Sequence, residues 1–526
     1  MSERPLFISQ VLPQTDREDE EIIRKCGDIS NIHRPGSIQP HGVYIGATEP
    51  DLKVTHVSEN TLKVFGIPYQ NVLDRTLDSI LAPDDLNVLK SNLGSKSFQM
   101  VNPLRLNVNN KPFDVILHRA DNTLVLELEP VINASESNID TYRNLSQEAI
   151  TQIMGAQSTK ELCQVAVDQI RKVTGYDRIT LYKYDEMWNG QVIAESLSPG
   201  TSSFMGQRFP AWETPAKTRE LYAKNPCRYI PHVFHVPTKV VSNNPAPIDM
   251  TYAQLRSCPD CHLQYMNNMG VSSTMSFPVV INGRLWALFT CHSMRPKEVS
   301  FTHRTICSQV AQVFPELLQA KEQPQAYQSK INGIRDRVLA AIESSGNVPQ
   351  GLIANQNDLL EMATADGIAV FANGAITTAG KTPEVGDIQQ LVNTLCDQYS
   401  GVVFKDDNDG LIYTSNFGQY IKRYATSLNG MAEKIATTGS GVLIVPINSS
   451  RTNYAIFFRG EQPTECVWGG NPDRSTLFPD KYNPTALTPR SAFNAWKQLV
   501  RGTSIPWIPY EVDAVKHLRD KLMQIN

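Results

Sequence analysis

The chain has 526 residues, of which 41% are hydrophobic and 19% are charged, and its formal net charge at pH 7 is −4. At about 150 residues per domain, this length predicts three or four domains, and the composition is that of a folded soluble protein. The slightly negative charge and the absence of Lys/Arg runs argue against a nucleic acid as a partner.

The N-terminal sequence is polar and acidic, and it contains no apolar stretch of the kind found in a signal peptide. No apolar run approaches the roughly 18 residues that a membrane helix requires. We therefore expect a cytoplasmic protein that does not contact a membrane. Nine cysteines are too few for a disulfide scaffold in this length, so most should be buried, reduced thiols.

The first predicted domain covers residues 43–132. Alternating apolar segments such as "LRLNV" and "FDVILHR" are separated there by turn clusters, which is typical of a small antiparallel α+β domain. Residues 145–175 then have the periodicity of two amphipathic helices ending at Gly175, and the strand "RITLYKY" follows at once. A second α+β domain should therefore begin near residue 140.

The segment "TMSFPVVINGRLWALFTCH" predicts a β-hairpin, because its Asn-Gly dipeptide suits a two-residue type I′ turn. A strict register from this turn would place His292 opposite Ser273 and would send Ser276 to the other face of the sheet. If His292 and Ser276 serve one pocket, a β-bulge near Pro278 is required.

Helical periodicity continues from about residue 299 to 345, with interruptions at Pro315 and Pro324, which predicts a long and kinked connecting helix. A third domain should fill residues 346–505. Within it, residues 460–500 are rich in Pro, Gly and Asn yet contain two tryptophans. A segment of this length without clear periodicity is typical of a functional arm or lid.

The last predicted element is a helix at the C-terminal end of the sequence. Val512, Val515, Leu518 and Leu522 have helical spacing there, and no stop signal follows them. We expect this helix to continue into a further module.

Two cysteines, Cys258 and Cys261, are separated by two residues in "SCPDCH". A zinc site needs four ligands, and although Cys227, His232 and His235 are candidates, no second Cys-x-x-Cys is present. A redox couple would require the motif between a strand and a helix of a βαβ unit, whereas a loop precedes it here. Neither a metal site nor a redox couple is therefore favoured.

Six motifs resemble phytochrome signatures and occur in the order and spacing of that family. Together they extend over nearly the whole chain, and six ordered matches are far more specific than any one of them. The motifs are "GSIQPHG" at 36–42, "PIDMTYAQLRS" at 247–257, "CHLQYMNNMGV" at 261–271, "LWALFTCH" at 285–292, "WGGNP" at 468–472 and "PRSAF" at 489–493.

The resemblance implies an α+β fold of three domains named PAS, GAF and PHY, with antiparallel sheets, long connecting helices and a tongue hairpin that extends from the PHY domain. The implied boundaries are an N-terminal arm at 1–27, PAS at 28–135, GAF at 140–320, PHY at 321–508 with the tongue at about 460–500, and the start of an output helix at 509–526.

The implied function is that of a red/far-red photoreceptor that binds a linear tetrapyrrole, or bilin, covalently. The chain should be a sensory fragment without enzymatic turnover, since Walker, Gly-x-Ser-x-Gly, His-Glu-x-x-His and kinase glycine motifs are absent from the sequence. Its partners should be a second copy of the chain and an output domain or response regulator, such as a histidine kinase or a diguanylate cyclase. The alternative is a PAS/GAF sensor of a small ligand or haem without photochemistry.

Two cysteines match bilin attachment positions of the family. Cys26 lies upstream of "PGSIQPHG", where bacterial phytochromes that carry biliverdin have their attachment cysteine. Cys261 directly precedes the GAF histidine, where cyanobacterial and plant phytochromes attach more reduced bilins such as phycocyanobilin. We favour Cys26 with biliverdin over Cys261 with a reduced bilin, and attachment at both stays open.

A bound bilin would bring a buried cation on its pyrrole nitrogens and two propionates, so the pocket needs carboxylates, acceptors and cationic donors. By resemblance, Arg228 and Arg256 match positions that bind one propionate. His262, Thr274 and Ser276 match positions around the other propionate and the pyrrole water. Without the resemblance, a lone arginine would be read as a surface charge.

The remaining implied contacts surround ring D of the bilin. His292 matches the histidine that hydrogen-bonds the ring D carbonyl. The aromatic positions that the resemblance places around ring D are Tyr182, Phe204, Phe209 and Tyr265, which strand spacing alone would assign to the core. Tyr222 is a further expected chromophore-binding residue.

The sequence departs from the family at two positions. Glu213 stands where the family has an aspartate, and although its backbone carbonyl can still accept from pyrrole N–H groups, its side chain is one methylene longer toward the matching tongue arginine, Arg490. Ala492 stands where the family has a serine in the tongue. We hypothesise that these changes displace the balance between the two photostates or slow photoconversion.

Overall fold

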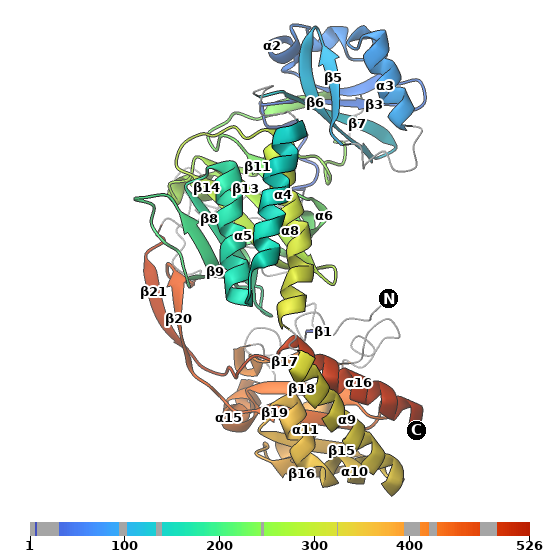
Figure 1. Ribbon diagram of the computed structural model, residues 1–526, viewed down its shortest axis with the longest axis vertical. Helices are drawn as coiled ribbons and strands as arrows, with labels where there is room; N and C mark the ends of the chain where they lie inside the picture. The colour runs from blue at the N-terminus through green and yellow to red at the C-terminus, as the bar shows by residue number, and fades with distance from the viewer. Residues whose placement is uncertain are drawn as a thin grey trace.

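Figure 1 shows a computed structural model of the protein, in which three domains are stacked along the long axis of the molecule. The structure describes residues 6–7, 31–93, 102–132, 139–243, 247–322, 325–393, 411–419, 429–473 and 492–525. The mixed α+β class with antiparallel sheets, expected from the sequence, is confirmed.

The first domain has a seven-stranded sheet in the order β2-β12-β4-β3-β7-β6-β5. Its strand β12 comes from later in the chain and pairs antiparallel with both β2 and β4, so the second domain contributes a strand to the first. The elements are β2 (Ser37–Ile38), β3 (Val43–Ala47), β4 (Val54–Ser58), α2 (Thr61–Phe65), α3 (Pro83–Leu93), β5 (Leu104–Val108), β6 (Lys111–Ala120), β7 (Thr123–Pro130) and β12 (Thr238–Ser242).

The second domain is built on an eight-stranded sheet in the order β11-β13-β14-β8-β9-β10-β20-β21. Three helices cover one face of its central strands (Figure 1). The strands are β8 (Arg178–Tyr184), β9 (Gly190–Leu197), β10 (Arg208–Phe209), β11 (Arg228–Ile230), β13 (Ser273–Ile281) and β14 (Arg284–Ser293), and the covering helices are α4 (Ile139–Gly155), α5 (Thr159–Thr174) and α8 (Phe301–Glu322).

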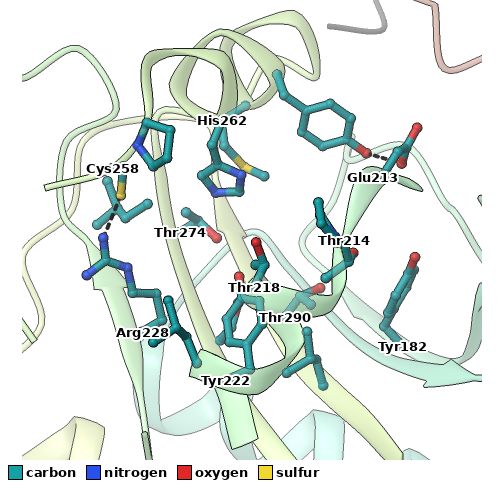
Figure 2. Close-up of a pocket in the computed structure, with 18 of the residues that line it drawn as sticks. Tyr182, Glu213, Thr214, Thr218, Tyr222, Arg228, Cys258, His262, Thr274 and Thr290 are labelled. Atoms are coloured by element: carbon teal, nitrogen blue, oxygen red, sulfur yellow. Dashed lines mark hydrogen bonds between the residues drawn. The ribbon is translucent and has the colours of Figure 1, made fainter. Parts of the chain in front are cut away.

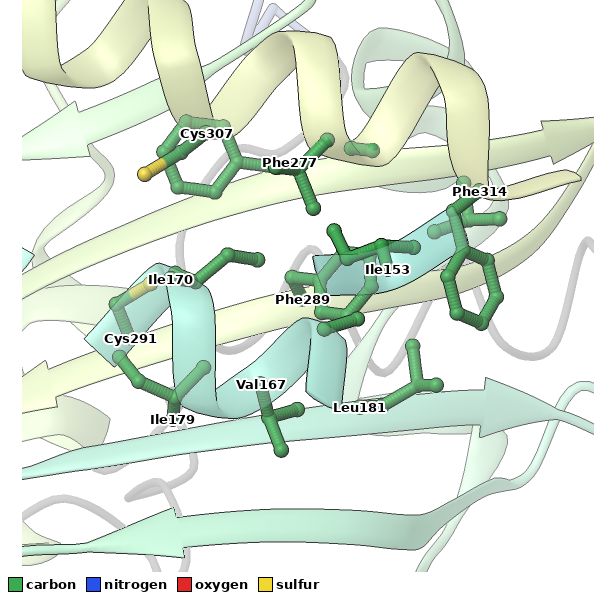
Figure 3. Close-up of a cluster of buried hydrophobic side chains, with 14 of the residues drawn as sticks. Ile153, Val167, Ile170, Ile179, Leu181, Phe277, Phe289, Cys291, Cys307 and Phe314 are labelled. Carbon is green, nitrogen blue, oxygen red and sulfur yellow. The ribbon is translucent and has the colours of Figure 1, made fainter. Parts of the chain in front are cut away.

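Alternation along these strands separates a hydrophobic face from a polar face. Figure 3 shows the helix-facing side, where Phe277, Phe289 and Leu181 meet apolar side chains of the covering helices such as Val167 and Phe314. Each fully buried aromatic or aliphatic side chain of this kind contributes about 1.5–3 kcal/mol. The next residue along each strand necessarily points to the opposite face, where no helix of this layer lies.

The register of the β13–β14 hairpin carries the expected bulge. The pairing shifts between Val279 and Val280, one residue beyond Pro278, and as a result His292 lies opposite Thr274 and Thr290 lies opposite Ser276. The Asn-Gly turn residues both have positive φ, as a type I′ turn requires. The bulge therefore brings the polar residues of both strands to one face.

The connecting helix differs from the sequence prediction. Pro315 was expected to interrupt it, yet α8 continues through this residue. Proline removes one backbone donor but leaves the rest of a long helix intact when tertiary packing holds it, and Phe314 and Leu318 beside it are buried. A second helix, α9 (Gln325–Ser345), follows, and Pro324 lies outside the described residues.

The third domain has a six-stranded sheet in the order β1-β17-β18-β19-β15-β16, with β1 parallel to β17. Its elements are β1 (Leu6–Phe7), α10 (Val348–Ala354), α11 (Gln356–Ala363), β15 (Gly367–Ala372), β16 (Ala375–Gly380), α12 (Val385–Val392), β17 (Ile412–Thr414), α15 (Asn429–Gly439), β18 (Gly441–Pro446), β19 (Tyr454–Arg459) and α16 (Pro509–Ile525). The four apolar residues predicted to line one face of the C-terminal helix are all buried in α16.

A buried ion pair fixes the start of α16. Arg459 donates to Glu511 at 2.8 Å, both side chains are at most 4% exposed, and the guanidinium lies over the Trp507 ring at 3.7 Å. Glu511 also accepts from the Ile508 backbone N–H. The buried charges therefore compensate each other where the helix leaves the domain.

The second and third domains contact each other through the β20–β21 hairpin and through the β8–β9 turn. The hairpin β20 (Thr464–Gly469) and β21 (Ala495–Val500) extends from the third domain along the second (Figure 1), and β20 pairs parallel with β10. In the other direction, the β8–β9 turn inserts Met187 into the core of the third domain, and its neighbour Glu186 accepts from the Ser415 backbone N–H at 2.8 Å.

Glycine at position 469 is required by this hairpin contact. A Cβ on Gly469 would lie 2.6 Å from the Phe209 ring of β10. We expect Gly469→Ala to push β20 away from β10 and to increase backbone amide exchange in both strands, measured by hydrogen–deuterium exchange. Gly386→Ala, where a Cβ would meet nothing within 4 Å, is the matched control, and unchanged exchange in Gly469→Ala would contradict the assigned contact.

Replacing Glu511 by alanine should leave the buried Arg459 charge uncompensated. We expect the free energy of unfolding of the third domain to fall by about 3–5 kcal/mol. Its thermal unfolding midpoint should then fall by about 6 °C or more. Glu465→Ala, which breaks the exposed pair with Lys497, is the control and should leave the midpoint unchanged. Equal midpoints for the two variants would refute the role of the buried pair.

Candidate functional site

The polar face of the second domain's sheet forms the floor of a cavity. Strands β8, β13 and β14 line it, together with the short helix η6 (Ala211–Glu213), α6 (Ala216–Lys224) and α7 (Asp260–Asn268). Figure 2 shows side chains from these elements arranged around a common space, with His262 of α7 and Tyr222 of α6 on opposite sides of it.

All twelve residues that the sequence assigned to the chromophore line this one cavity. Their roles toward a bilin stay predictions, but segments more than a hundred residues apart in the chain supply them. They are Tyr182, Phe204, Phe209, Glu213, Tyr222, Arg228, Arg256, His262, Tyr265, Thr274, Ser276 and His292.

The floor presents hydroxyl groups and one histidine. Thr274 and Ser276 of β13 and His292 of β14 are each at most 7% exposed. Thr290 lines the cavity beside them, and its hydroxyl lies 2.6 Å from that of Thr180 on β8. These donors and acceptors follow directly from the bulged register, since one residue of slip would turn every one of them toward the helices.

The two arginines are held by the chain itself. Arg228 donates to the backbone carbonyls of Gln254, Arg256 and Ser257 and to the Cys258 sulfur at 2.8 Å (Figure 2). Arg256 donates to the carbonyls of residues 250 and 251. Among the described residues, the hydrogen-bond acceptors of both guanidiniums are therefore backbone oxygens and one sulfur, with no carboxylate.

This arrangement suits an anionic ligand. Burial, followed by the nearby charge of Arg228, lowers the pKa of Arg256 to about 9, so the low dielectric and the second cation both disfavour its charge. The Nε of Arg256 is buried without a hydrogen-bond partner. A carboxylate placed between the arginines would relieve both conditions, so the residues fit the propionates of the expected bilin.

The histidines of the cavity are neutral at physiological pH. Burial lowers the pKa of His262 to about 4, and Arg228 adds to this shift. Burial likewise lowers the pKa of His292 to about 3, with Arg178 and His262 acting in the same direction. Each neutral imidazole has one donor and one acceptor nitrogen and carries no charge.

The Glu213 carboxylate has a hydrogen-bond partner that the sequence did not predict. The Tyr265 hydroxyl donates to Glu213 Oε2 at 2.8 Å. This hydrogen bond ties the Glu213 side chain to α7. Its expected partner Arg490 lies outside the described residues, as does the attachment candidate Cys26.

The alternative attachment candidate, Cys261, is partly buried in the first turn of α7 and lines the cavity. Cys258, interpreted from the sequence as a bystander, lines it too and contacts Arg228. Within the part of the chain that the structure describes, no group of three or more His, Cys, Asp or Glu side chains could hold a metal ion.

An aromatic wall closes one end of the cavity and joins it to the β20–β21 hairpin. Tyr182 and Phe204 contact Phe209 with ring centroids 5.8 Å and 5.7 Å apart, and Tyr265 contacts Phe493 at 5.3 Å. Phe493 follows Ala492, which is exposed. Trp212 donates to the Pro472 carbonyl at 3.4 Å.

Sequence reasoning missed several residues of this cavity. Two of them are aromatic residues that the sequence offered as a signal: Phe493 ends the motif "PRSAF" and Trp212 directly precedes Glu213. Nothing in a single sequence distinguishes a cavity threonine or methionine from a core one. The missed residues include Thr180, Trp212, Cys258, Met266, Met269 and Thr290 on the cavity wall, and Phe493 against Tyr265.

No helix among the described residues is both long and apolar enough to span a membrane.

Comparison with known proteins places all three domains. Family models match as "PAS fold" at residues 28–131, "GAF domain" at 158–314 and "Phytochrome region" at 331–526. The chain is 33% identical to cyanobacterial phytochrome B of Nostoc sp. over 95% of its own length and 66% of that protein. It is 29% identical to a bacteriophytochrome of Pseudomonas aeruginosa over 96% of its own length and 66% of that protein.

The solved structures agree. The photosensory core module of the Stigmatella aurantiaca phytochrome is 30% identical, with a TM-score of 0.79 over 94% of this chain and 96% of that one. The chain spans about two thirds or less of the length of its curated relatives. It belongs to the phytochrome family, and its three domains are the PAS, GAF and PHY domains of a phytochrome photosensory core.

Proposed function

We propose that the chain senses red and far-red light through a bilin held in the GAF cavity and passes the change to an output module beyond α16. The observation that carries this proposal is the convergence of paired arginines, neutral histidines, hydroxyls and aromatic rings on one cavity of a phytochrome fold. A haem or small-metabolite sensor would not require that set, and nothing in the comparisons favours one.

The chain's own residues would hold the cofactor by charge and shape. Arg228 and Arg256 would bind a propionate through hydrogen bonds between opposite charges, each worth about 1.5–3 kcal/mol. The carbonyl of residue 213 would accept from pyrrole N–H groups, while His262, Thr274 and Ser276 would surround the second propionate. The bilin, when bound, supplies light absorption and double-bond isomerisation.

The cofactor we favour is biliverdin attached at Cys26, with a reduced bilin such as phycocyanobilin at Cys261 as the alternative. Attachment requires a thiolate, which adds to a vinyl or ethylidene group of ring A, while a proton goes to the neighbouring carbon. Cys261 lines the cavity, which keeps this alternative available.

The protein groups would convert isomerisation into movement of the tongue. Phe493 and the Tyr265–Glu213 hydrogen bond join the tongue hairpin to the cavity, and we propose that Glu213 also contacts Arg490. A change at ring D would rearrange bonds at Tyr182, Tyr265 and His292 and release the tongue. Two bilin isomers that bind two tongue conformations unequally suffice to shift their populations.

The chain itself would have no turnover, and its signal would pass to a histidine kinase, a diguanylate cyclase or a response regulator. We further propose that it forms a homodimer. α4, α5 and α8 cover one face of the GAF sheet as an exposed layer, which is consistent with a helical dimer contact (Figure 1).

The first test mixes apoprotein separately with biliverdin and phycocyanobilin and records absorption before and after red and far-red light. Covalent retention is measured after denaturation in wild type, Cys26→Ala and Cys261→Ala. We expect a red-absorbing, photoreversible adduct with biliverdin that only Cys26→Ala abolishes. Loss only in Cys261→Ala would move attachment to the GAF cysteine, and a protein that neither bilin colours would overturn the proposed function.

A second test addresses the two departures from the family. Glu213→Asp removes the methylene that lets the carboxylate reach Tyr265, and Ala492→Ser restores the tongue hydroxyl. We expect each change to alter the photostate ratio under saturating red light or the rate of conversion, measured by difference spectroscopy. Wild-type photoconversion of full extent that neither substitution changes would disprove the displaced balance.

A further inference from the structure

Arg178 is a buried residue of β8 that lies beside His292 and outside the six recognised motifs. The two residues face each other directly across the β8–β14 pairing, so both side chains project from the polar face of the sheet. Arg178 is 1% exposed, and its Nη1 is 3.5 Å from His292 Nδ1.

The chemistry of the two groups decides which of them donates the hydrogen bond and which accepts it. A guanidinium has only N–H donors and does not lose its proton in proteins. His292 Nδ1 must therefore accept, and an imidazole nitrogen that accepts carries no proton. In a neutral ring the single proton is then on Nε2.

Arg178 is held so that it cannot turn away. Its Nε is 3.9 Å from Glu195 Oε1, with side chains 2% and 4% exposed, and it donates to the Ser202 carbonyl at 3.2 Å and to the Ser202 hydroxyl at 3.0 Å. The guanidinium also lies over the Phe204 ring at 3.9 Å. Glu195 is fixed in turn by the Phe204 backbone N–H at 2.9 Å.

The charges around His292 are consistent with a neutral ring. Arg178 and His262 are the ionisable groups that act on it, and both disfavour protonation, as burial does. In the neutral ring, the only donor of His292 is the nitrogen that Arg178 does not contact.

We propose that Arg178 is a positioning residue that fixes His292 as the Nε2–H tautomer, so that the cavity presents one fixed donor to a carbonyl acceptor of the ligand. This proposal rests on the proposed function for the identity of the ligand, in which the acceptor is the ring D carbonyl of a bilin. The tautomer itself belongs to the protein and is defined without a ligand.

The experiment is nitrogen NMR of apoprotein labelled with ¹⁵N-histidine, with the His292 signals assigned by comparison with His292→Gln. Between about pH 5 and 8, where a free histidine titrates, we expect Nε2 to carry the proton and Nδ1 to stay unprotonated throughout. Protonated Nδ1 in the wild-type protein would overturn the proposal without any variant.

The variant test removes the donor without leaving an unpaired buried carboxylate. In Arg178→Met/Glu195→Gln, we expect the Nδ1–H tautomer to appear with a several-fold rise in its population. Glu195→Gln alone keeps the Arg178 donor and should keep the wild-type tautomer. An identical tautomer in the double variant would show that Arg178 does not set it.

The same samples loaded with biliverdin separate the two proposals. If the Nε2 signal of the wild-type protein shifts on loading and the shift is smaller in the double variant, the result supports both bilin binding and the positioning role of Arg178. Retention of the Nε2–H tautomer in an apoprotein that binds neither biliverdin nor phycocyanobilin would refute the proposed function and leave the assignment of Arg178 standing.

Discussion

The register of the β13–β14 hairpin is the constraint on which the rest of the site depends. Side chains alternate along a strand, so one residue of pairing shift exchanges the two faces of that strand. The shift between Val279 and Val280 places Thr274 and Ser276 beside His292 and Thr290, and it leaves Phe277 and Phe289 to the helical layer. The same pairing continues into β8, which adds Arg178 and Tyr182 to the polar face. A hydrophobic core and a ligand cavity therefore occupy opposite faces of one sheet.

Charge is distributed over this cavity in a way that favours a particular ligand. The cavity is surrounded by two arginines that donate to backbone oxygens, two histidines kept neutral by burial, and a carboxylate hydrogen-bonded to Tyr265. Such a site can bind anionic carboxylates at one end and a flat conjugated system along its length. The tongue hairpin, β20–β21, continues the same sheet through β10. The aromatic end of the cavity is therefore connected to the PHY domain through this hairpin.

The sequence indicated much of the cavity, because the resemblance carried by six ordered motifs assigned twelve residues to a ligand pocket, and all twelve line the cavity. It also required the bulge, since His292 and Ser276 could not otherwise share a face. Other features depend on three-dimensional packing. Arg178 reads as an ordinary strand-end charge until its pairing with His292 is known, and the Glu213–Tyr265 bond spans 52 residues. Pro315 stays inside a helix because buried neighbours hold the helix on both sides of it.

The most direct test of this account is a crystal structure of the biliverdin-loaded protein in darkness. The account predicts continuous density for a linear tetrapyrrole over the polar face of β13 and β14, with a propionate within hydrogen-bonding distance of Arg228 or Arg256 and a terminal ring beside His292. Density for the bilin at any other place, or a hairpin register that turns Thr274 and Ser276 toward the helices, would contradict it.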